Sequence, residues 1–362
     1  MIASGTPPLE TIKNNIAAGL YSTITGKLLG RSRKVLRKKI NLDPPNWLLA
    51  FTFTFLVASS GIVASSSLGY KLSSPVFYLF LANCSYILTT TLLVEYLANW
   101  IIRFIDSQML DALEHESDFS DLAHLLENLF SNKRQLRFGI FFSIAAHVGF
   151  IGIDPSLLFI VGWPLVAANL VLNFFHGIVV YYFINYIFVF VKRLSMYQYK
   201  LFEPNPSASE IIHNINNLLN RIFYMVLFLA TIFSVWMTYG NQFGLPNLSV
   251  ILSLMISWGL GIGLLIIHFK TISSIIVAGK WRALKQIQSE IKALQSKSPI
   301  LDIQTLEQMN KLLDYHERIK STPNSLLDQS LFFGVFNTFI IPVVGTLIGN
   351  LKTLLPILLG FF

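Results

Sequence analysis

The chain has 362 residues, of which 53% are hydrophobic and 13% are charged, and its formal net charge is +8. Soluble domains carry about a quarter charged residues, so this composition is typical of a membrane protein. The single cysteine, Cys84, excludes a disulfide framework and a cysteine-based zinc site. Orientation in a membrane accounts for the excess positive charge, as argued next, so we expect no nucleic-acid partner.

Seven hydrophobic runs of the chain are candidate membrane spans. They lie at about 47–68, 75–105, 138–153, 156–191, 222–239, 248–278 and 331–351. When the chain is threaded through these spans, every Lys and Arg except Lys71 and Lys352 falls on one side. Basic residues concentrate in cytoplasmic loops, so we expect the N-terminus in the cytoplasm and the C-terminus outside. The predicted class is an all-α, polytopic protein that is integral to the plasma or inner membrane and has the lipid bilayer as a partner.

Residues 1–46 form a basic, amphipathic segment ahead of a membrane domain at 47–351, and 352–362 form an apolar tail. Within the first segment, Lys27 to Ile40 contains seven basic residues among apolar ones. Positive charge before a span fixes the orientation of that span, and this is the interpretation we favour. The alternative is a helix that lies on an anionic inner leaflet.

The second, fourth and sixth runs are longer than the bilayer requires. Residues 75–105 would form a helix roughly 45 Å long, whereas the hydrocarbon core is ~30 Å thick. We therefore expect these helices to extend into the cytoplasm and to form a bundle there. Its other members would be the helical segments at 105–137, 193–221 and 279–325. An apolar stripe in the last segment is expected to pack in the bundle: Leu306, Met309, Leu312 and Leu313.

Glycine and proline positions predict how some spans bend and pack. The sequence Gly162-Trp163-Pro164 is expected to kink one long fourth helix. Two glycine pairs at a spacing of four match the pattern that lets membrane helices approach closely. These pairs are Gly259 with Gly263 and Gly345 with Gly349.

Few polar side chains lie inside the predicted spans. His147 is expected near the midplane of the third span. Asn169, Asn173 and His176 are spaced by four and three residues, so they share one face of the fourth span. These four residues are the candidates for a ligand site or polar cavity, and hydrogen bonding between helices is the alternative. Glu95 is expected at the inner interface without a functional role.

Motifs of common enzymes are absent from the sequence. It has no HExxH, P-loop, Gly-x-Ser-x-Gly or strand-associated dinucleotide motif. We therefore expect neither enzymatic activity nor a bound cofactor. Acidic residues from Asp106 to Asp121 occur beside His115 and His124, but their spacing fits no standard metal loop. A solvated helix face is the expected explanation, and no metal site is predicted.

The architecture resembles that of the insect odorant and gustatory receptors, which have seven spans, an internal N-terminus and a cytoplasmic anchor bundle. Their last helix is split, and here Ile303 to Ile319 and Leu331 to Leu351 resemble its two halves. Leu327 to Leu331 resembles the entry into that last span. Thr338-Phe339 and the five apolar residues that follow resemble the start of the family's C-terminal signature, although Gly345-Thr346 stands where the family has Gln-Phe.

This resemblance implies a homotetrameric, ligand-gated cation channel whose seventh span lines the central pore. The residues expected at the pore or its gate are Asn337, Thr338, Val344, Thr346 and Leu347. A small-molecule ligand is implied as well. Two other classes remain open: a transporter that works by alternating access, and a membrane effector or scaffold whose cytoplasmic helices dock a partner.

Overall fold

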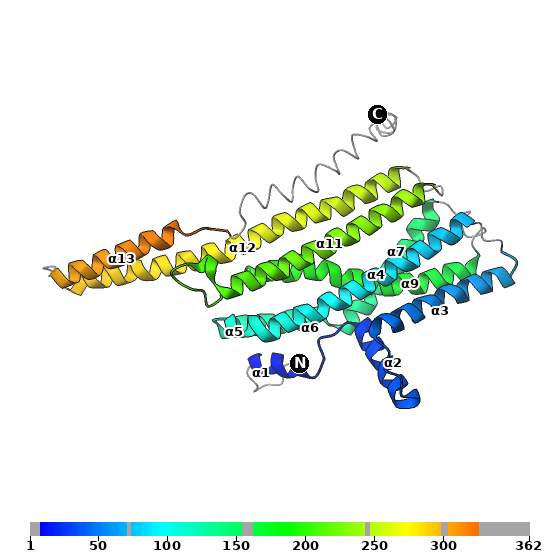
Figure 1. Ribbon diagram of the computed structural model, residues 1–362, viewed down its shortest axis with the longest axis horizontal. Coiled ribbons are helices and arrows are strands. Elements are labelled where there is room, and N and C mark those ends of the chain that lie inside the picture. The colour runs from blue at the N-terminus through cyan, green and yellow to red at the C-terminus, as the bar shows by residue number, and fades with distance from the viewer. Residues whose placement is uncertain (1–7, 71–73, 154–161, 243–246, 298–302, 326–362) are drawn as a thin grey trace.

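The computed structural model describes residues 8–70, 74–153, 162–242, 247–297 and 303–325 (Figure 1). Within these ranges the regular structure is helical, apart from one isolated bridge between Leu113 and Tyr199. The predicted all-α class is therefore confirmed for the described part of the chain. The residues expected to form the seventh span and the apolar tail lie outside it.

The helices are named in chain order as in Figure 1. Their bounds are α1 Pro8–Ala17, α2 Ile24–Ile40, α3 Asn46–Ser67, α4 Ser74–Phe104, α5 Leu110–Ala112, α6 Glu116–Leu129, α7 Asn132–Ile153, α9 Trp163–Ile184, α10 Val191–Leu194, α11 Glu210–Gln242, α12 Asn247–Lys297 and α13 Ile303–Ser321. Short π-helical turns at Ile105–Met109 and Asn185–Phe190 join α4 to α5 and α9 to α10. Two of the predicted overlong helices therefore continue through a π-helical turn.

Five helical segments of the described chain are long and apolar enough to cross a membrane. They are Asn46–Ser67, Phe80–Ala112, Trp163–Leu194, Glu210–Ser234 and Gly259–Ser296. These segments match the predicted first, second, fourth, fifth and sixth spans, and they indicate an integral membrane protein. The predicted third span falls within the helix α7, which begins at Asn132 rather than at Phe138 and is not among these five segments, so this span stays a prediction.

The bundle has two unlike ends (Figure 1). At one, here called the turn end, α3 and α11 finish while α4, α9 and α12 begin. At the other, the extension end, the chain continues into α5, α6 and the long hairpin of α12 and α13. Measured from the turn end, α4 contains no Lys or Arg before Arg103, α12 none before Lys270, and α3 none at all. Glu95 is the one acidic residue in these stretches of the described helices.

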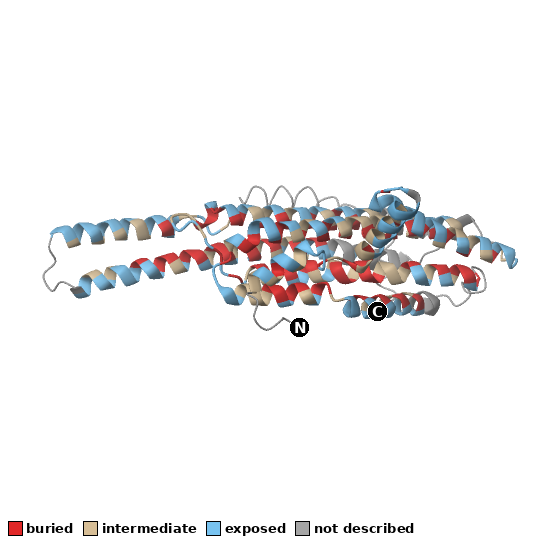
Figure 2. Cartoon of the chain, turned by 90° about the horizontal axis from the view of Figure 1, so that it is seen from below, coloured by how far each residue is buried: buried red, intermediate tan, exposed pale blue. Residues whose placement is uncertain are grey.

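The main hydrophobic core lies toward the extension end, beyond the level of Glu95. Its largest fully buried side chains include Leu97, Ile101, Ile105, Met109, Leu113, Leu122, Tyr182, Tyr186 and Phe190. Figure 2 shows buried residues between the helices and exposed ones on their outer faces. Most of these core residues belong to the apolar segments Phe80–Ala112 and Trp163–Leu194, and Leu122 extends the core into α6.

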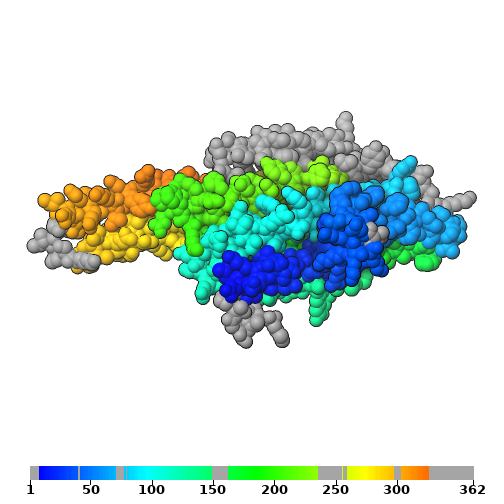
Figure 3. All heavy atoms as spheres, turned by 60° about the horizontal axis from the view of Figure 1, so that its bottom comes forward, coloured from blue at the N-terminus to red at the C-terminus, as the bar shows by residue number. Residues whose placement is uncertain are grey.

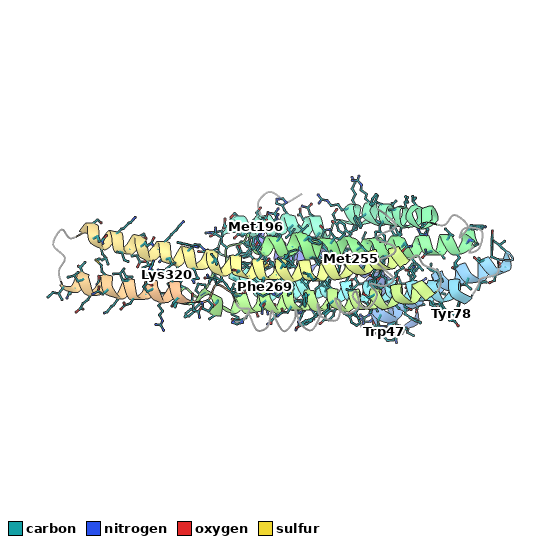
Figure 4. The ribbon with its side chains drawn as sticks, turned by 90° about the horizontal axis from the view of Figure 1, so that it is seen from above. Trp47, Tyr78, Met196, Met255, Phe269 and Lys320 are labelled. Carbon is teal, nitrogen blue, oxygen red and sulfur yellow. The ribbon has the colours of Figure 1, made fainter. Side chains whose placement is uncertain are left out.

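The C-terminal hairpin departs from the predicted bundle. The helix α13 packs along α12, where Ile319 joins Leu284 and Ile287 in a small separate core. Figure 4 places Lys320 on this hairpin, far from Tyr78 near the turn end. Of the predicted apolar stripe, Leu312 packs against this core, whereas Leu306 and Leu313 are 43% and 46% exposed. The expectation that the whole stripe packs is therefore wrong, because the hairpin offers α13 one principal neighbour.

A break, not a kink, occurs at Gly162-Trp163-Pro164. The helix α9 begins at Trp163, with Pro164 in its first turn, where its missing N–H costs nothing. Gly162 has φ +79°, and a Cβ there would lie 2.6 Å from the ring of Tyr70. The prediction of a continuous kinked helix through this point is wrong. In the predicted segment at 193–221 the chain is largely irregular between Ser195 and Ser209, where Pro204-Asn205-Pro206 is a helix breaker, and α11 begins at Glu210, next to the helix start that the sequence predicts at Ser207 or Ser209.

Close helix approach occurs at glycines other than the predicted ones. A Cβ on Gly177 of α9 would lie 2.7 Å from the Cβ of Phe142 and 3.0 Å from the Cα of Gly139, both on α7. By contrast, a Cβ on Gly259 or Gly263 would meet no described atom within 4 Å. No described helix approaches the α12 pair this closely, and its close contact stays a prediction. The Gly345 and Gly349 pair lies outside the described residues.

Candidate functional site

A hydrogen-bonded polar group joins α4, α7 and α9 in the half of the bundle nearer the turn end. The Nδ2 of Asn83 donates to Oδ1 of Asn169 over 3.0 Å, and Nδ2 of Asn169 lies 3.5 Å from Nε2 of His147. The Nδ1 of His147 is 2.8 Å from the carbonyl oxygen of Ser143. A carbonyl only accepts, so the imidazole carries its hydrogen on Nδ1 and accepts from Asn169 through Nε2. Two of the predicted residues thus meet, together with Asn83, which the sequence analysis missed.

A second polar pair lies two helical turns farther along the same faces. Thr90 and His176 each follow a member of the first group by seven residues, and Oγ1 of Thr90 is 3.3 Å from Nδ1 of His176. The Thr90 hydroxyl also lies 2.9 Å from the Ile87 carbonyl, to which it donates. The imidazole N–H is then the donor to Thr90, and Nε2 is an acceptor. Asn173 makes no hydrogen bond to either group within the described residues.

The side chain of His176 lines a cavity of about 290 Å³ between α4, α9, α11 and α12. The polar lining consists of Tyr86, Thr90 and His176, and the remaining lining is apolar. That apolar lining is Val94, Val179, Val180, Phe183, Val226, Leu229, Ala230, Phe233 and Leu260. The ring centroids of Tyr86 and His176 lie 5.5 Å apart. A small cavity with apolar walls and a few convergent polar groups is the usual form of a small-molecule site.

The Asn83–Asn169–His147 group and the Thr90–His176 pair together are called the polar seam here. Farther along α4, Glu95 contacts the N-terminus of α2. The hydroxyls of Thr23 and Thr25 donate to its Oε1, and the backbone N–H of Ile24 donates to Oε1 of Gln135 over 3.0 Å. A carboxylate at a helix N-terminus interacts favourably with the helix dipole. Glu95 therefore has a structural partner, which the prediction of a merely interfacial residue did not include.

The acidic segment beside His115 and His124 joins loops at the extension end. Asp121 pairs with Arg193 over 3.1 Å and accepts from the hydroxyl of Tyr197 over 3.1 Å. Glu114 pairs with Arg282 over 2.6 Å. In the part of the chain that the structure describes, no three His, Cys, Asp or Glu side chains are placed to hold a metal ion. These carboxylates therefore link α6, the α10 region and α12.

The predicted pore residues Asn337, Thr338, Val344, Thr346 and Leu347 all lie outside the described residues. The described site thus comprises the polar seam and its cavity. No protein-family model matches the chain, and no curated protein or solved structure matches it. The likeness to the chemoreceptors accordingly rests on architecture and on the C-terminal residues named above.

Proposed function

We propose that this protein is an oligomeric, ligand-gated cation channel of the chemoreceptor type, with seven spans and a cytoplasmic N-terminus. The observation that carries the proposal is the cavity beside His176, which is lined by four helices of the described bundle. Changes in the packing of these helices can reach the extension end, because α4, α9 and α12 each continue there.

Orientation with the extension end in the cytoplasm is supported by the basic residues. In the described helices, the stretches nearest the turn end contain no Lys or Arg, and every Lys and Arg lies closer to the extension end than these stretches. This distribution is what the positive-inside rule requires. The buried core beyond Glu95 and the α12–α13 hairpin would then stand in the cytoplasm, where water drives their packing.

The ligand that fits the cavity is small and mostly apolar, with one hydroxyl group. The volume of the cavity, about 290 Å³, is near the lower limit for ligand pockets. The ligand hydroxyl would donate a hydrogen bond to Nε2 of His176. The surrounding valine and phenylalanine side chains would contact the apolar part of the ligand. Leaving such a buried acceptor unpaired is costly, so the hydroxyl gives selectivity over an apolar analogue.

Conduction would occur along the seventh span, at the centre of a tetramer. Asn337, Thr338 and Thr346 supply uncharged polar groups there, and Val344 and Leu347 supply a hydrophobic gate. The exposed apolar residues of α13, Leu306 and Leu313, would contact neighbouring copies. Each subunit would thus contribute a ligand cavity of its own.

A matched pair of compounds tests this function: 4-ethylphenol and ethylbenzene, which differ by one hydroxyl. We expect 4-ethylphenol to raise the melting temperature of the purified protein more than ethylbenzene, and His176→Phe to abolish the difference. In potassium-loaded proteoliposomes, 4-ethylphenol should release potassium from wild-type vesicles and not from protein-free ones. Equal stabilisation by both compounds would contradict the ligand site, and a monomeric protein that passes no potassium would contradict the channel.

The exposed hairpin also favours a second candidate, a membrane scaffold that docks a cytoplasmic partner. A scaffold needs no ligand cavity and no central axis. A particle with span seven on its outer perimeter, together with no potassium release, would support the scaffold over the channel.

A further inference from the structure

We propose that the groove between α2, α3 and α4 is a binding site for an anionic phospholipid of the leaflet at the extension end. One acyl chain lies in the groove, and the phosphate lies among the basic side chains of α2. The site is separate from the cavity beside His176 and does not depend on ligand gating.

The helix α2 has the position of an interfacial helix. Figure 1 shows it pointing away from the bundle, across the direction of α3. A short linker joins it to α3, whose second residue, Trp47, is 57% exposed, and an aromatic side chain at the start of a span is typical of the membrane interface. In Figure 3 the N-terminal residues, coloured blue, lie on the surface of the molecule. A helix in this position lies in the plane of the membrane surface.

The N-terminal half of α2 is held against the bundle, and the groove lies beneath this half. At its N-terminus, Thr23 caps the helix by accepting from the N–H of Gly26 over 2.8 Å, and Glu95 holds the same turn. Lys27 donates to Oδ1 of Asn132 on α7 over 3.0 Å. Midway along α2, Arg33 pairs with Asp43 of the linker that follows the helix.

A cavity of about 140 Å³ lies under α2. Its lining is Thr25, Leu28, Leu29 and Ser32 from α2, Leu49, Ala50, Phe53 and Thr54 from α3, Ile87, Leu88 and Thr91 from α4, and Leu172 and Phe175 from α9. Leu28 and Phe53 are 42% and 40% exposed, so the cavity opens on the outer surface of the bundle. An apolar cavity of about 150 Å³ accepts a benzene ring. The space under α2 therefore accepts a short stretch of acyl chain.

The charge on α2 selects an anionic headgroup. This helix carries seven basic residues and no acidic one. Five of the basic residues are exposed and make no ion pair with a described residue: Arg31, Lys34, Arg37, Lys38 and Lys39. Burial, and after it the charge of Arg31, lower the pKa of the Lys27 amine. A bound phosphate would relieve this repulsion.

Native mass spectrometry of the full chain in detergent tests the proposal with equal amounts of phosphatidylglycerol and phosphatidylcholine. We expect the wild type to retain phosphatidylglycerol preferentially. The α2 variant replaces three exposed basic residues by glutamine: R31Q, K34Q and K38Q. The attraction that each basic residue near the surface contributes predicts that the three replacements together lower the preference about a hundredfold.

A control variant removes the same charge from the hairpin by K285Q, K292Q and K311Q, at residues that are exposed as well. It should retain the wild-type preference. Equal retention of the two lipids by the wild type, or an equal loss in both variants, would overturn the proposal. Displacement of the lipid by soluble glycerol 3-phosphate would also overturn it, because the site would then bind a free phosphate.

A separate variant tests the groove itself. Ala50 is 6% exposed and lines the cavity, so Ala50→Phe fills the space while leaving every basic residue in place. We expect it to retain less phosphatidylglycerol than the wild type. An unchanged melting temperature without added lipid shows that the variant is folded. Wild-type retention by this variant would overturn the acyl-chain site.

Discussion

Hydrogen bonds within the polar seam predict a measurable contribution of Asn169 to stability. Asn169→Leu leaves Asn83 and His147 without this partner in an apolar surrounding, where a hydrogen bond between helices contributes about 1 kcal/mol. We expect a lower melting temperature in detergent. Asn173→Leu is the matched control, on the same helix and outside the seam, and should change the melting temperature less. The reverse order would show that the seam does not hold these helices together.

Packing at Gly177 predicts a second residue-scale effect. A methyl group there would meet the backbone of Gly139 and the Cβ of Phe142, neither of which is the free end of a flexible side chain. Gly177→Ala should therefore destabilise the protein by about 1–3 kcal/mol. The same substitution at Gly259 meets no described atom within 4 Å and should be neutral or slightly stabilising. Thermal unfolding of the two variants in one detergent compares them directly.

At the residue scale, the sequence could predict what depends on position along a helix. Counting from helix ends placed His147 and Asn169 inside the membrane domain, and the structure joins them. Asn83 could not be selected, because a single Asn in a span has no periodic signal and its role depends on the partner helix. The close contact at Gly177 was missed for the same reason, since spacing along one chain says nothing about which glycine faces a neighbour.

At the element scale, length and hydropathy predicted most helices, and tertiary partners decided the rest. The overlong α4 and α12 follow directly from their apolar runs. The break before Trp163 was predicted as a kink, because Gly and Pro signal an interruption without specifying its angle. The exposed side of α13 could not be foreseen, since an amphipathic pattern predicts a buried face and does not identify the number of neighbours.

The α12–α13 hairpin predicts a specific role for Lys280. Its Nζ donates to the backbone carbonyls of Lys320 and Thr322, over 3.1 and 2.6 Å, and to Oδ1 of Asn324 over 2.8 Å. Lys320 lies in the last turn of α13, where helix carbonyls lack intrahelical partners, and Thr322 and Asn324 follow the end of the helix. Lys280→Met keeps the apolar stem and removes the donor, so we expect faster amide hydrogen exchange in residues 303–324. Lys285→Met, at an exposed position, is the control and should leave this exchange unchanged.

At the scale of the whole molecule, composition and charge predicted the membrane class, and the structure adds two unlike ends. At the extension end α6, the α10 region and the hairpin are linked by the Arg193–Asp121 and Arg282–Glu114 pairs. A sequence does not reveal such pairs, because their members are far apart along the chain. Which end of the bundle faces the cytoplasm remains a prediction that labelling can test.

Cysteine labelling tests the proposed topology in a background where Cys84, the single native cysteine, is replaced by Ser. Leu68→Cys and Asn247→Cys lie at the turn end and should react with a membrane-impermeant maleimide in intact cells. Met196→Cys and Ser296→Cys are exposed at the extension end, and they should react only after permeabilisation. The physical reason is that moving the basic extension end across the membrane would oppose the positive-inside bias. Reaction of Met196→Cys in intact cells would mean that α7 and α9 do not both cross as proposed. The direction in which each helix from α11 onward crosses the membrane would then be reversed, and the α12–α13 hairpin would not lie in the cytoplasm.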